Sequence, residues 1–149
     1  WKVAEPMAIG ENDYETEINI SKNLVSSSIL KINDKHIQGA PNSAISQKQT
    51  IKVKKLDSIE FDFSKNIFLK IDTQGFEKNV LNGAKESLKK IHLVSVEISL
   101  VELYENAGSW LEIIDFMDKS GFYLYGLETA FVDNNTGQVL QIDGIFARK

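Results

Sequence analysis

Residues 67–84, which read IFLKIDTQGFEKNVLNGA, contain the change of pattern that decides the fold. The stretch from Ile67 to Ile71 is almost continuously apolar, as is typical of a strand buried on both faces of a parallel sheet. After it, apolar residues recur at three- and four-residue spacing, which predicts a helix with one buried stripe. The stripe consists of Phe76, Val80, Leu81, Ala84, Leu88 and Ile91. A strand that leads directly into a helix favours an α/β fold.

The alternation of strand and helix continues toward the C-terminus. Residues 93–98 predict a second buried strand, and Ser109 with Glu112 forms the pattern of a capping box at the start of a second helix. The expected buried face of that helix consists of Trp110, Ile113, Ile114 and Met117. From residue 122 onward the pattern predicts short strands joined by turns that are too short for helical crossovers. We therefore expect a mostly parallel sheet with an antiparallel C-terminal strand.

The first part of the chain follows a different pattern, which predicts a β-rich segment over residues 1–60 with a long polar loop. Residues 3–10 indicate a short strand, and residues 26–49 indicate mostly loop. Residues 61–149 contain the strands and helices described above. We see no second domain, so the chain is predicted to be a single unit made of these two portions.

Two short segments of the first portion alternate polar and apolar residues. Residues 16–20 and 50–54 both follow this pattern, which predicts half-buried strands. The apolar positions expected to pair in an antiparallel ribbon are Ile18 and Ile20 with Ile51 and Val53. Lysines cluster near Lys54, and the simplest interpretation is a solvated strand face.

Composition excludes several classes of protein. The 149 residues include no cysteine, which removes disulfides, thiolate metal sites and cysteine nucleophiles. A net charge of −4 gives no electrostatic basis for binding nucleic acid or an anionic membrane. No apolar run approaches the ~20 residues that span a bilayer. We expect a soluble, cytoplasmic protein that binds neither nucleic acid nor membrane.

The carboxyl ends of the two buried strands are the predicted functional site, since ligands of open α/β sheets bind there. Asp72 follows the first strand and Glu97 ends the second, so both carboxylates would point into one crevice if the strands are neighbours. A helix N-cap is an equally good interpretation of Asp72. Lys70 lies within a strand expected to be buried, and Glu77 or Glu97 is its expected partner. Gly75 allows a positive φ or a close backbone approach.

Other residues give weaker signals. His36 and His92 are far apart and have no metal-ligand spacing, so no metal site is expected. Tyr104 falls near the crevice, where it could line a pocket, although a half-exposed tyrosine without a role is the simpler interpretation. The serines at 26–28 favour a turn over substrate binding. Gly83 inside the helix pattern indicates a tight contact between helix and sheet rather than a catalytic role.

The block from Leu69 to Glu77, followed by residues 80–84, resembles the FkbM-type methyltransferases, whose sequences carry K-I-D-V-[EQ]-G-x-E-x-x-V-L-x-G-A. Shorter elements of the family also have counterparts here in the same order. These are residues 8–10, 26–30, 53–59, 96–99 and 142–148. The resemblance thus runs along the whole chain, and its long central block is the specific part.

This resemblance implies a class I, Rossmann-like methyltransferase that uses S-adenosylmethionine to methylate a hydroxyl group of a carbohydrate or secondary metabolite. Its sheet would have seven strands, the last antiparallel. The implied cofactor-binding residues are Ala8, Ile9, Asp72 and Thr73. The implied catalytic group consists of Asp72, Glu97, Lys70 and Glu77. Asp72 or Glu97 would accept the hydroxyl proton, while Lys70 and Glu77 would set the geometry and charge of Asp72.

One departure from the family is large, because its glycine-rich cofactor loop and the acidic residue that holds the ribose have no counterpart here. Two βα units, about 60 residues, are missing upstream. We therefore interpret Trp1 as a cut edge, and the chain as a truncated, acceptor-side portion that is inactive alone and binds no measurable S-adenosylmethionine. The alternative is a non-catalytic α/β module that associates through its exposed sheet edge, which would also allow a homo-oligomer.

Overall fold

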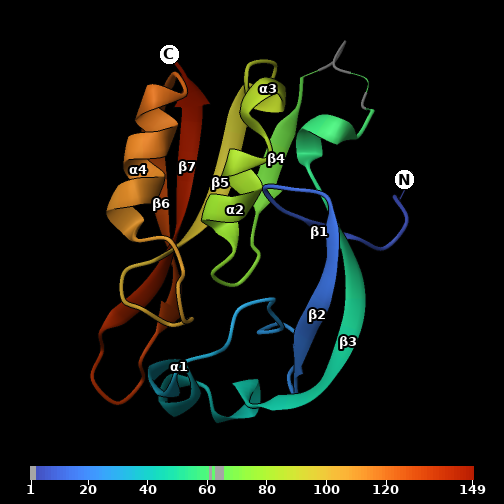
Figure 1. The fold of residues 1–149 in the computed structure, drawn as a ribbon. Helices are drawn as coiled ribbons and strands as arrows, with labels where there is room; N and C mark the ends of the chain where they lie inside the picture. Colours follow the sequence, from blue (N-terminus) through green and yellow to red (C-terminus); the bar gives the residue numbers. More distant parts are fainter. Residues whose placement is uncertain (1–2, 61, 63–65) are drawn as a thin grey trace.

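The computed structural model describes residues 3–60, 62 and 66–149, and these residues form two β-sheets with short helices (Figure 1). Trp1 lies outside the described residues. The elements of the first portion are β1 (Ala8–Ile9), β2 (Tyr14–Ser21), α1 (Asp34–Gly39), η1 (Pro41–Ser43), β3 (Ile45–Lys54) and η2 (Leu56–Ser58). Those of the second are β4 (Phe68–Ile71), α2 (Glu77–Asn82), α3 (Lys85–Leu88), β5 (Leu93–Ser99), α4 (Trp110–Lys119), β6 (Phe122–Val132) and β7 (Val139–Arg148).

The first sheet contains the predicted antiparallel ribbon, with the strand order β1-β3-β2. β2 runs antiparallel to β3, and β1 runs parallel to β3. The register differs from the expected one, because Ile18 lies opposite Gln49 and Ile51 lies opposite Thr16. The offset is an even number of residues, so the isoleucines still share a face. The strand expected over residues 3–10 is limited to Ala8–Ile9.

The polar residues between β2 and β3 are more ordered than the predicted loop. They contain α1 and η1, and β3 begins earlier than expected, at Ile45. His36 on α1 is buried. Its ring bonds Tyr104, and Ile32 and Ile37 pack against a cluster that includes Leu103 and Leu140. These contacts are distant in sequence, which explains why local pattern alone indicated a loop.

The second sheet has the order β4-β5-β7-β6 and is mixed. β4 and β5 are parallel, whereas β7 runs antiparallel to both β5 and β6. The antiparallel last strand is therefore confirmed, and the expectation of a mostly parallel sheet is wrong. The physical reason is the tight turn after β6, in which Gly137 donates its backbone N–H to the carbonyl of Asp133 and sends the chain straight back as β7. β7 then inserts between β5 and β6, so each of its neighbours is an antiparallel pair.

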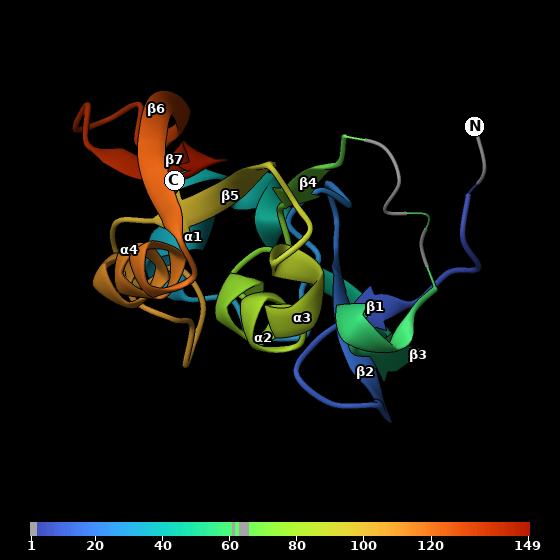
Figure 2. The same cartoon turned by 90° about the horizontal axis from the view of Figure 1, so that it is seen from above.

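Helices α2, α3 and α4 lie on one face of this sheet (Figure 2). β5 is central and buried along most of its length. β4 lies at an edge of the sheet, and its Phe68 is 56% exposed. The prediction of burial on both faces is thus confirmed for β5 and wrong for β4, because β4 has a neighbouring strand on one side and helices over one face.

The predicted continuous helix after β4 is divided into α2 and α3. All six residues of its apolar stripe are buried, so the stripe itself is confirmed. The division occurs at Gly83, where a Cβ would lie 1.9 Å from the carbonyl oxygen of Gly10. Asp57 completes the division, since its backbone N–H donates to Gly83 and its carboxylate accepts the N–H groups of Glu86 and Ser87 at the start of α3. Gly83 therefore makes the tight contact that the pattern indicated.

Helix α4 begins at the predicted capping box. Ser109 Oγ accepts the N–H of Glu112, and the Glu112 carboxylate accepts the N–H of Ser109. Ile113 and Met117 are buried as expected, but Trp110 is 44% exposed, so its assignment to the core is wrong. Trp110 is the first residue of the helix, one turn before the buried Ile113.

The carboxyl ends of β4 and β5 point toward the segment that contains α1 (Figure 1). The space between these strand ends and that segment contains the candidate site. Among the described residues, no helix combines the length and apolar character needed to cross a membrane.

Candidate functional site

The loop that leaves β4 has an unusual backbone. Gln74 has φ of 55° and Gly75 has φ of 95°, both in the left-handed region. A Cβ on Gly75 would lie 2.8 Å from the Tyr104 side chain, so this position requires glycine for its φ and for the close approach. The turn directs the Gln74 side chain toward the end of β5.

The buried carboxylate of Glu77 anchors the loop after β4 by accepting hydrogen bonds from it. Its Oε1 accepts the backbone N–H of Thr73 at 2.9 Å, the Thr73 hydroxyl at 3.1 Å and the backbone N–H of Gly75 at 3.1 Å. Burial raises the pKa of the Glu77 carboxyl, and the N–H donors oppose that rise. All these contacts are to Thr73 and Gly75, so Glu77 fixes the geometry of the loop that follows Asp72.

Asp72 and Glu97 meet at the exits of β4 and β5, as the sequence predicted. Gln74 joins them, because its Nε2 donates to Asp72 Oδ1 at 2.9 Å and to Glu97 Oε2 at 2.7 Å. Gln141 on β7 donates a further hydrogen bond to Glu97 Oε2 at 2.8 Å. Asp72 caps no helix here, since Phe76 occupies the N-cap of α2. The amide of Gln74 therefore holds two carboxyl groups at a fixed separation.

A chain of hydrogen bonds fixes the orientation of Gln74. Its Oε1 accepts from the Tyr104 hydroxyl at 2.6 Å, and that hydroxyl also lies 3.1 Å from His36 Nε2. Because the single hydroxyl proton of Tyr104 goes to Gln74, His36 must donate from Nε2. His36 Nδ1 then accepts from Ser43 Oγ at 3.1 Å. Burial lowers the pKa of His36, which agrees with this neutral tautomer.

Tyr104 differs from its expected half-exposed state, since it is completely buried. Burial, together with the nearby carboxylates, raises the pKa of its hydroxyl above the ordinary value. The Tyr104 hydroxyl therefore keeps its proton and does not act as a base. Tyr104 packs against Gly75 and His36, behind the carboxyl pair.

The two carboxyl groups differ in environment. Burial raises the pKa of Glu97 to about 8, and the neighbouring Asp72, Glu77 and Asp143 charges add to the rise. Glu97 is therefore largely protonated at neutral pH. Asp72 is partly exposed and lies 3.5 Å from the ammonium group of Lys70.

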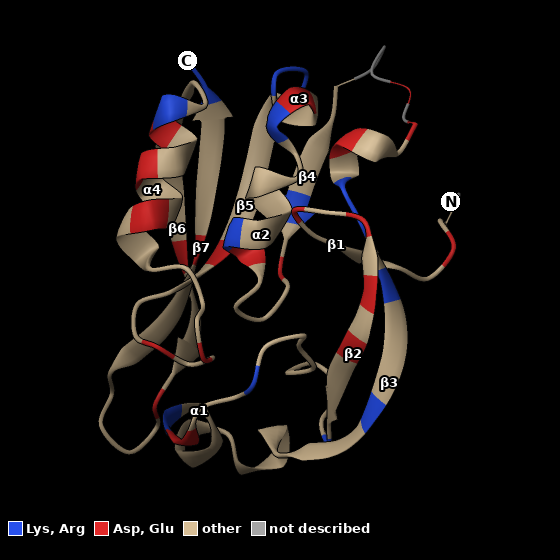
Figure 3. Cartoon of the chain, in the orientation of Figure 1, with Lys and Arg blue, Asp and Glu red and all other residues tan. Residues whose placement is uncertain are grey.

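Lys70 corrects one expectation. It is partly exposed rather than buried, and its ammonium group pairs with Asp143 at 3.0 Å and with Asp72, not with Glu77 or Glu97. Its position on the uncovered face of the edge strand β4 explains the exposure. Burial lowers the pKa of Lys70, but the carboxylates of Asp143 and Asp72 outweigh burial and raise it overall. Figure 3 shows acidic residues gathered where β5, β7 and the loop after β4 approach one another.

Two cavities meet at Asp72. One, which we call the Glu97 cavity, has a volume of about 300 Å³, and its walls include Glu97, Gln74, His36 and Gln141. The other, the β1 cavity, has a volume of about 210 Å³ and lies beside Ala8, Ile9 and Thr73. The structure thus brings all four residues predicted to bind the cofactor, Asp72 included, to one cavity. Glu97 lines the other, whereas Lys70 and Glu77 line neither of these two.

S-adenosylmethionine is the cofactor that the family resemblance implies for the residues of the β1 cavity. The volume of this cavity is below the about 300–1,000 Å³ of sites that enclose a whole drug-sized ligand. Its walls combine apolar side chains, such as Ile9 and Phe76, with the Asp72 carboxylate. That combination suits a methyl-bearing cation. No group of three or more His, Cys, Asp or Glu side chains is placed to hold a metal ion within the described part of the chain.

Sequence reasoning missed several residues of the site. Gln74 lies inside the quoted block, and an amide between an aspartate and a glycine at a strand exit was a usable signal. Gln141 and His36 gave no local signal. The serines at 26–28 do form a turn, in which Ser27 Oγ donates to the carbonyl of Leu24. They also line the cavities, Ser26 the Glu97 cavity and Ser27 and Ser28 the β1 cavity.

Comparison with known proteins identifies a family for most of the chain. A family model described as the methyltransferase FkbM domain matches residues 2–124, which include the block after β4. Residues 142–148, which also resemble the family, lie outside the match. Searches of curated proteins and of solved structures found no match. The chain therefore belongs to the FkbM methyltransferase family.

Proposed function

We propose that this chain is the acceptor-side portion of an S-adenosylmethionine-dependent methyltransferase that methylates a hydroxyl group of a carbohydrate or secondary metabolite. The observation that carries the proposal is the position of Asp72, which lines both cavities at the exit of β4. Donor and acceptor must meet at one point for methyl transfer, and Asp72 is at the point where two separate cavities meet. Membership of the FkbM family supports methyl transfer as the reaction.

We also propose that the second sheet is part of a class I methyltransferase sheet. In its support, β4, β5 and β6 run in one direction and β7 runs in the opposite direction between β5 and β6. An antiparallel last strand is what the family resemblance implies. The free edge of β4 is where further parallel strands would be added.

On the donor side, Ala8, Ile9, Thr73 and Asp72 would hold part of S-adenosylmethionine, which supplies an electrophilic methyl group on a sulfonium. The Asp72 carboxylate would favour the positive charge of the cofactor. The apolar walls of the β1 cavity would exclude water around the methyl group. Glu77 contributes by holding Thr73 and Gly75 in place.

On the acceptor side, the hydroxyl proton must leave when the oxygen is methylated. Of the two carboxyl groups, Asp72 is the proposed proton acceptor, because Glu97 with its pKa of about 8 already carries a proton at neutral pH. Protonated Glu97 would instead donate a hydrogen bond to the acceptor. Gln74 holds the two carboxyl groups at a fixed separation, and Lys70 positions Asp72 through their ion pair.

The walls of the Glu97 cavity support a hydroxyl-bearing acceptor. Asn23, Ser26 and Gln141 offer neutral hydrogen-bonding groups, and Phe131 offers an apolar ring face. Uncharged donors and acceptors beside one aromatic ring suit a neutral polyol, since sugars present both hydroxyl groups and an apolar face.

The test is Asp72→Asn in the complete protein that this chain's gene encodes. The rate of methyl transfer should fall by about 10²–10⁴-fold, the usual contribution of a general base. Asp143→Asn is the matched control, because Asp143 shares the Lys70 ion pair but lines neither cavity. An unchanged rate in Asp72→Asn, or an equal loss in both variants, would remove Asp72 from the reaction.

A calorimetric titration tests the cofactor assignment separately. We expect the complete protein to bind S-adenosylmethionine and the 149-residue chain alone to show no measurable binding, because the β1 cavity is smaller than the whole cofactor. Tight binding by the 149 residues would contradict the assignment of this chain to the acceptor side.

A further inference from the structure

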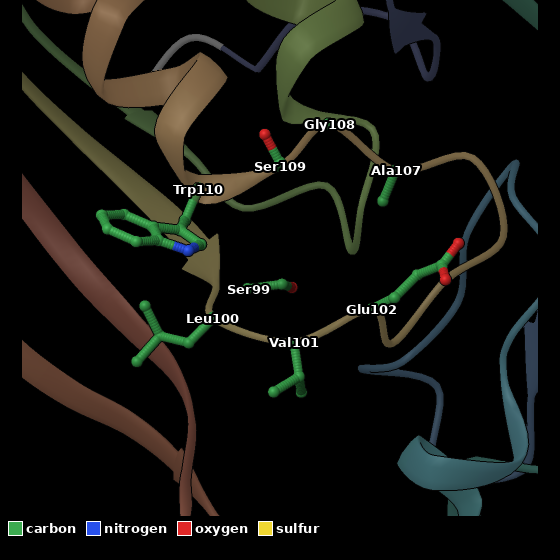
Figure 4. Close-up of a pocket in the computed structure, with 8 residues that line it drawn as sticks. All are labelled: Ser99, Leu100, Val101, Glu102, Ala107, Gly108, Ser109 and Trp110. Atoms are coloured by element: carbon green, nitrogen blue, oxygen red, sulfur yellow. The ribbon is translucent and has the colours of Figure 1, made fainter.

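A third cavity lies where β5 ends and α4 begins, on the far side of Ser99 from the carboxyl pair. It is lined by residues 99–102 and 107–110 and has a volume of about 210 Å³. We call it the Trp110 cavity. Figure 4 shows the Trp110 indole and the Leu100 side chain near one another at one end of the cavity, and Glu102 toward the other end.

The Trp110 ring is the main unexplained feature of this cavity. The residue is 44% exposed, although the helix pattern predicts burial. An exposed indole beside Leu100, Val101 and Ala107 is an apolar wall that water solvates poorly. A ligand ring placed against this wall would remove apolar surface from water on both partners.

The start of α4 argues against an anion as the ligand. Ser109 already accepts the N–H of Glu112, and Glu112 accepts the N–H of Ser109, so this helix end is capped by its own side chains. The same capping box fixes the first turn of the helix and with it the position of Trp110. The Glu102 carboxylate would also repel a negative ligand. The cavity therefore does not suit an anion, and its apolar wall favours a ligand with an apolar ring.

The Trp110 cavity is joined to the candidate site by one side chain. Gln141 Nε2 lies 2.8 Å from Glu97 Oε2 and 3.3 Å from Ser99 Oγ. Gln141 lines the Glu97 cavity and Ser99 lines the Trp110 cavity. The hydrogen-bonded side chains of Gln141 and Ser99 thus separate the two cavities, which are neighbours in the fold.

We propose that the Trp110 cavity binds an apolar ring of the methyl acceptor, while the hydroxyl-bearing part of the same molecule occupies the Glu97 cavity. The proposal rests on the proposed function for its choice of occupant. It narrows the acceptor to molecules that carry a polar, hydroxylated part and an apolar ring, such as a sugar linked to an aryl group.

Phenol is a suitable probe of the cavity, because its binding needs neither cofactor nor methyl transfer. In ¹H–¹⁵N spectra of the chain, Trp110→Phe assigns the indole signal, since the sequence contains two tryptophans. We expect phenol at millimolar concentration to shift the Trp110 indole signal and the backbone signals of residues 99–102 and 107–110.

Trp110→Ala should weaken phenol binding at least fivefold. Leu111→Ala is the matched control, since Leu111 is the next residue of α4, is 60% exposed and does not line the cavity. Val101→Asn, which changes the polarity of the wall and leaves the helix intact, should also weaken binding. Unshifted cavity signals at tens of millimolar phenol, or equal weakening by Trp110→Ala and Leu111→Ala, would overturn the ring site.

The result of the phenol experiment does not depend on whether the proposed methyl transfer takes place. Failure of S-adenosylmethionine binding or an unaffected Asp72→Asn variant would remove the methyltransferase assignment and leave phenol binding unchanged. Failure of phenol binding would remove the ring site and leave the role of Asp72 standing. In the complete protein, Trp110→Ala should raise KM for an aryl-bearing acceptor at least fivefold with kcat unchanged, whereas Asp72→Asn lowers kcat.

Discussion

The β1 cavity and the Glu97 cavity share Asp72, yet their walls are built differently. Next to Asp72, the β1 cavity is bounded by apolar residues of the first sheet, such as Ile9 and Ile51, and its shape follows from packing. The Glu97 cavity is bounded by a hydrogen-bonded chain that runs from Glu97 through Gln74 and Tyr104 to His36. Packing tolerates small changes of volume, whereas a buried polar chain loses a partner with each deletion.

This contrast indicates a division of labour at Asp72. On the apolar side, packing sets the shape of the β1 cavity. On the polar side, hydrogen bonds fix the orientation of the side chains that line the Glu97 cavity. The Glu97 side should therefore be sensitive to single-atom changes and to pH, and the β1 side should be tolerant of both.

The largest effect is expected at Gly75, which supports the polar side. Gly75→Ala forces a side chain into φ of 95° and 2.8 Å from Tyr104. Left-handed strain of about 1–3 kcal/mol and overpacking of about 1–3 kcal/mol together predict a loss of about 4 kcal/mol in the free energy of unfolding. Urea denaturation measures the loss.

Gly137→Ala is the control for backbone strain alone. Gly137 has φ of 73°, and a Cβ there would meet nothing within 4 Å. Its cost should be about 1 kcal/mol. Equal losses in the two variants would show that the contact between Gly75 and Tyr104 contributes nothing.

The next effect concerns pH and Glu97. Burial holds the pKa of Glu97 at about 8 in the folded protein, whereas the unfolded chain has the ordinary value of 4.5. Between these values unfolding releases a proton, so the contribution of Glu97 to stability is complete below pH 4.5 and is lost as pH rises to 8. The slope is up to about 1.4 kcal/mol per pH unit, or about 3 kcal/mol between pH 5 and pH 7.

Glu97→Gln should remove this slope, because the amide has no proton to release and can still accept from Gln74 and Gln141. Denaturation at several pH values between 5 and 8 measures it. Glu112→Gln is the control of opposite sign, since hydrogen bonds from Lys78 and Ser109 lower the pKa of Glu112 to about 2. Its contribution is present above pH 4.5 and lost only as pH falls toward 2. A wild-type slope that persists in Glu97→Gln would assign the titration to another group.

Periodicity and strand ends predicted much of the fold and the centre of the site. Buried stripes identified the helices, and the exits of two buried strands identified Asp72 and Glu97. The sheet arrangement was not predictable in the same way, because strand partners are chosen by contacts distant in sequence. The division of the helix at Gly83 depends on Gly10, which approaches only in the folded chain.

The hydrogen-bonded part of the site was hidden for the same reason. Gln141 bonds a residue 44 positions away, and Tyr104 bonds His36 across 68 positions. Neither side chain belongs to a local pattern, and each has a role only after β7 has inserted beside β5 and α1 has packed under the strand ends. The prediction for Trp110 was wrong in the opposite direction, because its helical period indicated a core position although this first residue of α4 is 44% exposed.

The smallest expected effects come from two variants that each remove one heavy atom, one on each side of Asp72. Tyr104→Phe removes the hydroxyl that donates to Gln74 and accepts from His36. The loss leaves the buried His36 ring and the half-buried Gln74 amide without this partner and costs about 1–3 kcal/mol. Ile9→Val removes one methyl group from the β1 cavity and costs about 0.5 kcal/mol, because Ile9 is only partly buried. Urea denaturation of both variants measures the difference. Tyr123→Phe, on an exposed tyrosine, controls for hydroxyl removal itself and should change stability by less than about 0.5 kcal/mol. Losses of equal size in Tyr104→Phe and Ile9→Val would mean that the polar chain behaves like ordinary packing, and the contrast between the two cavities would then be one of composition without an energetic consequence.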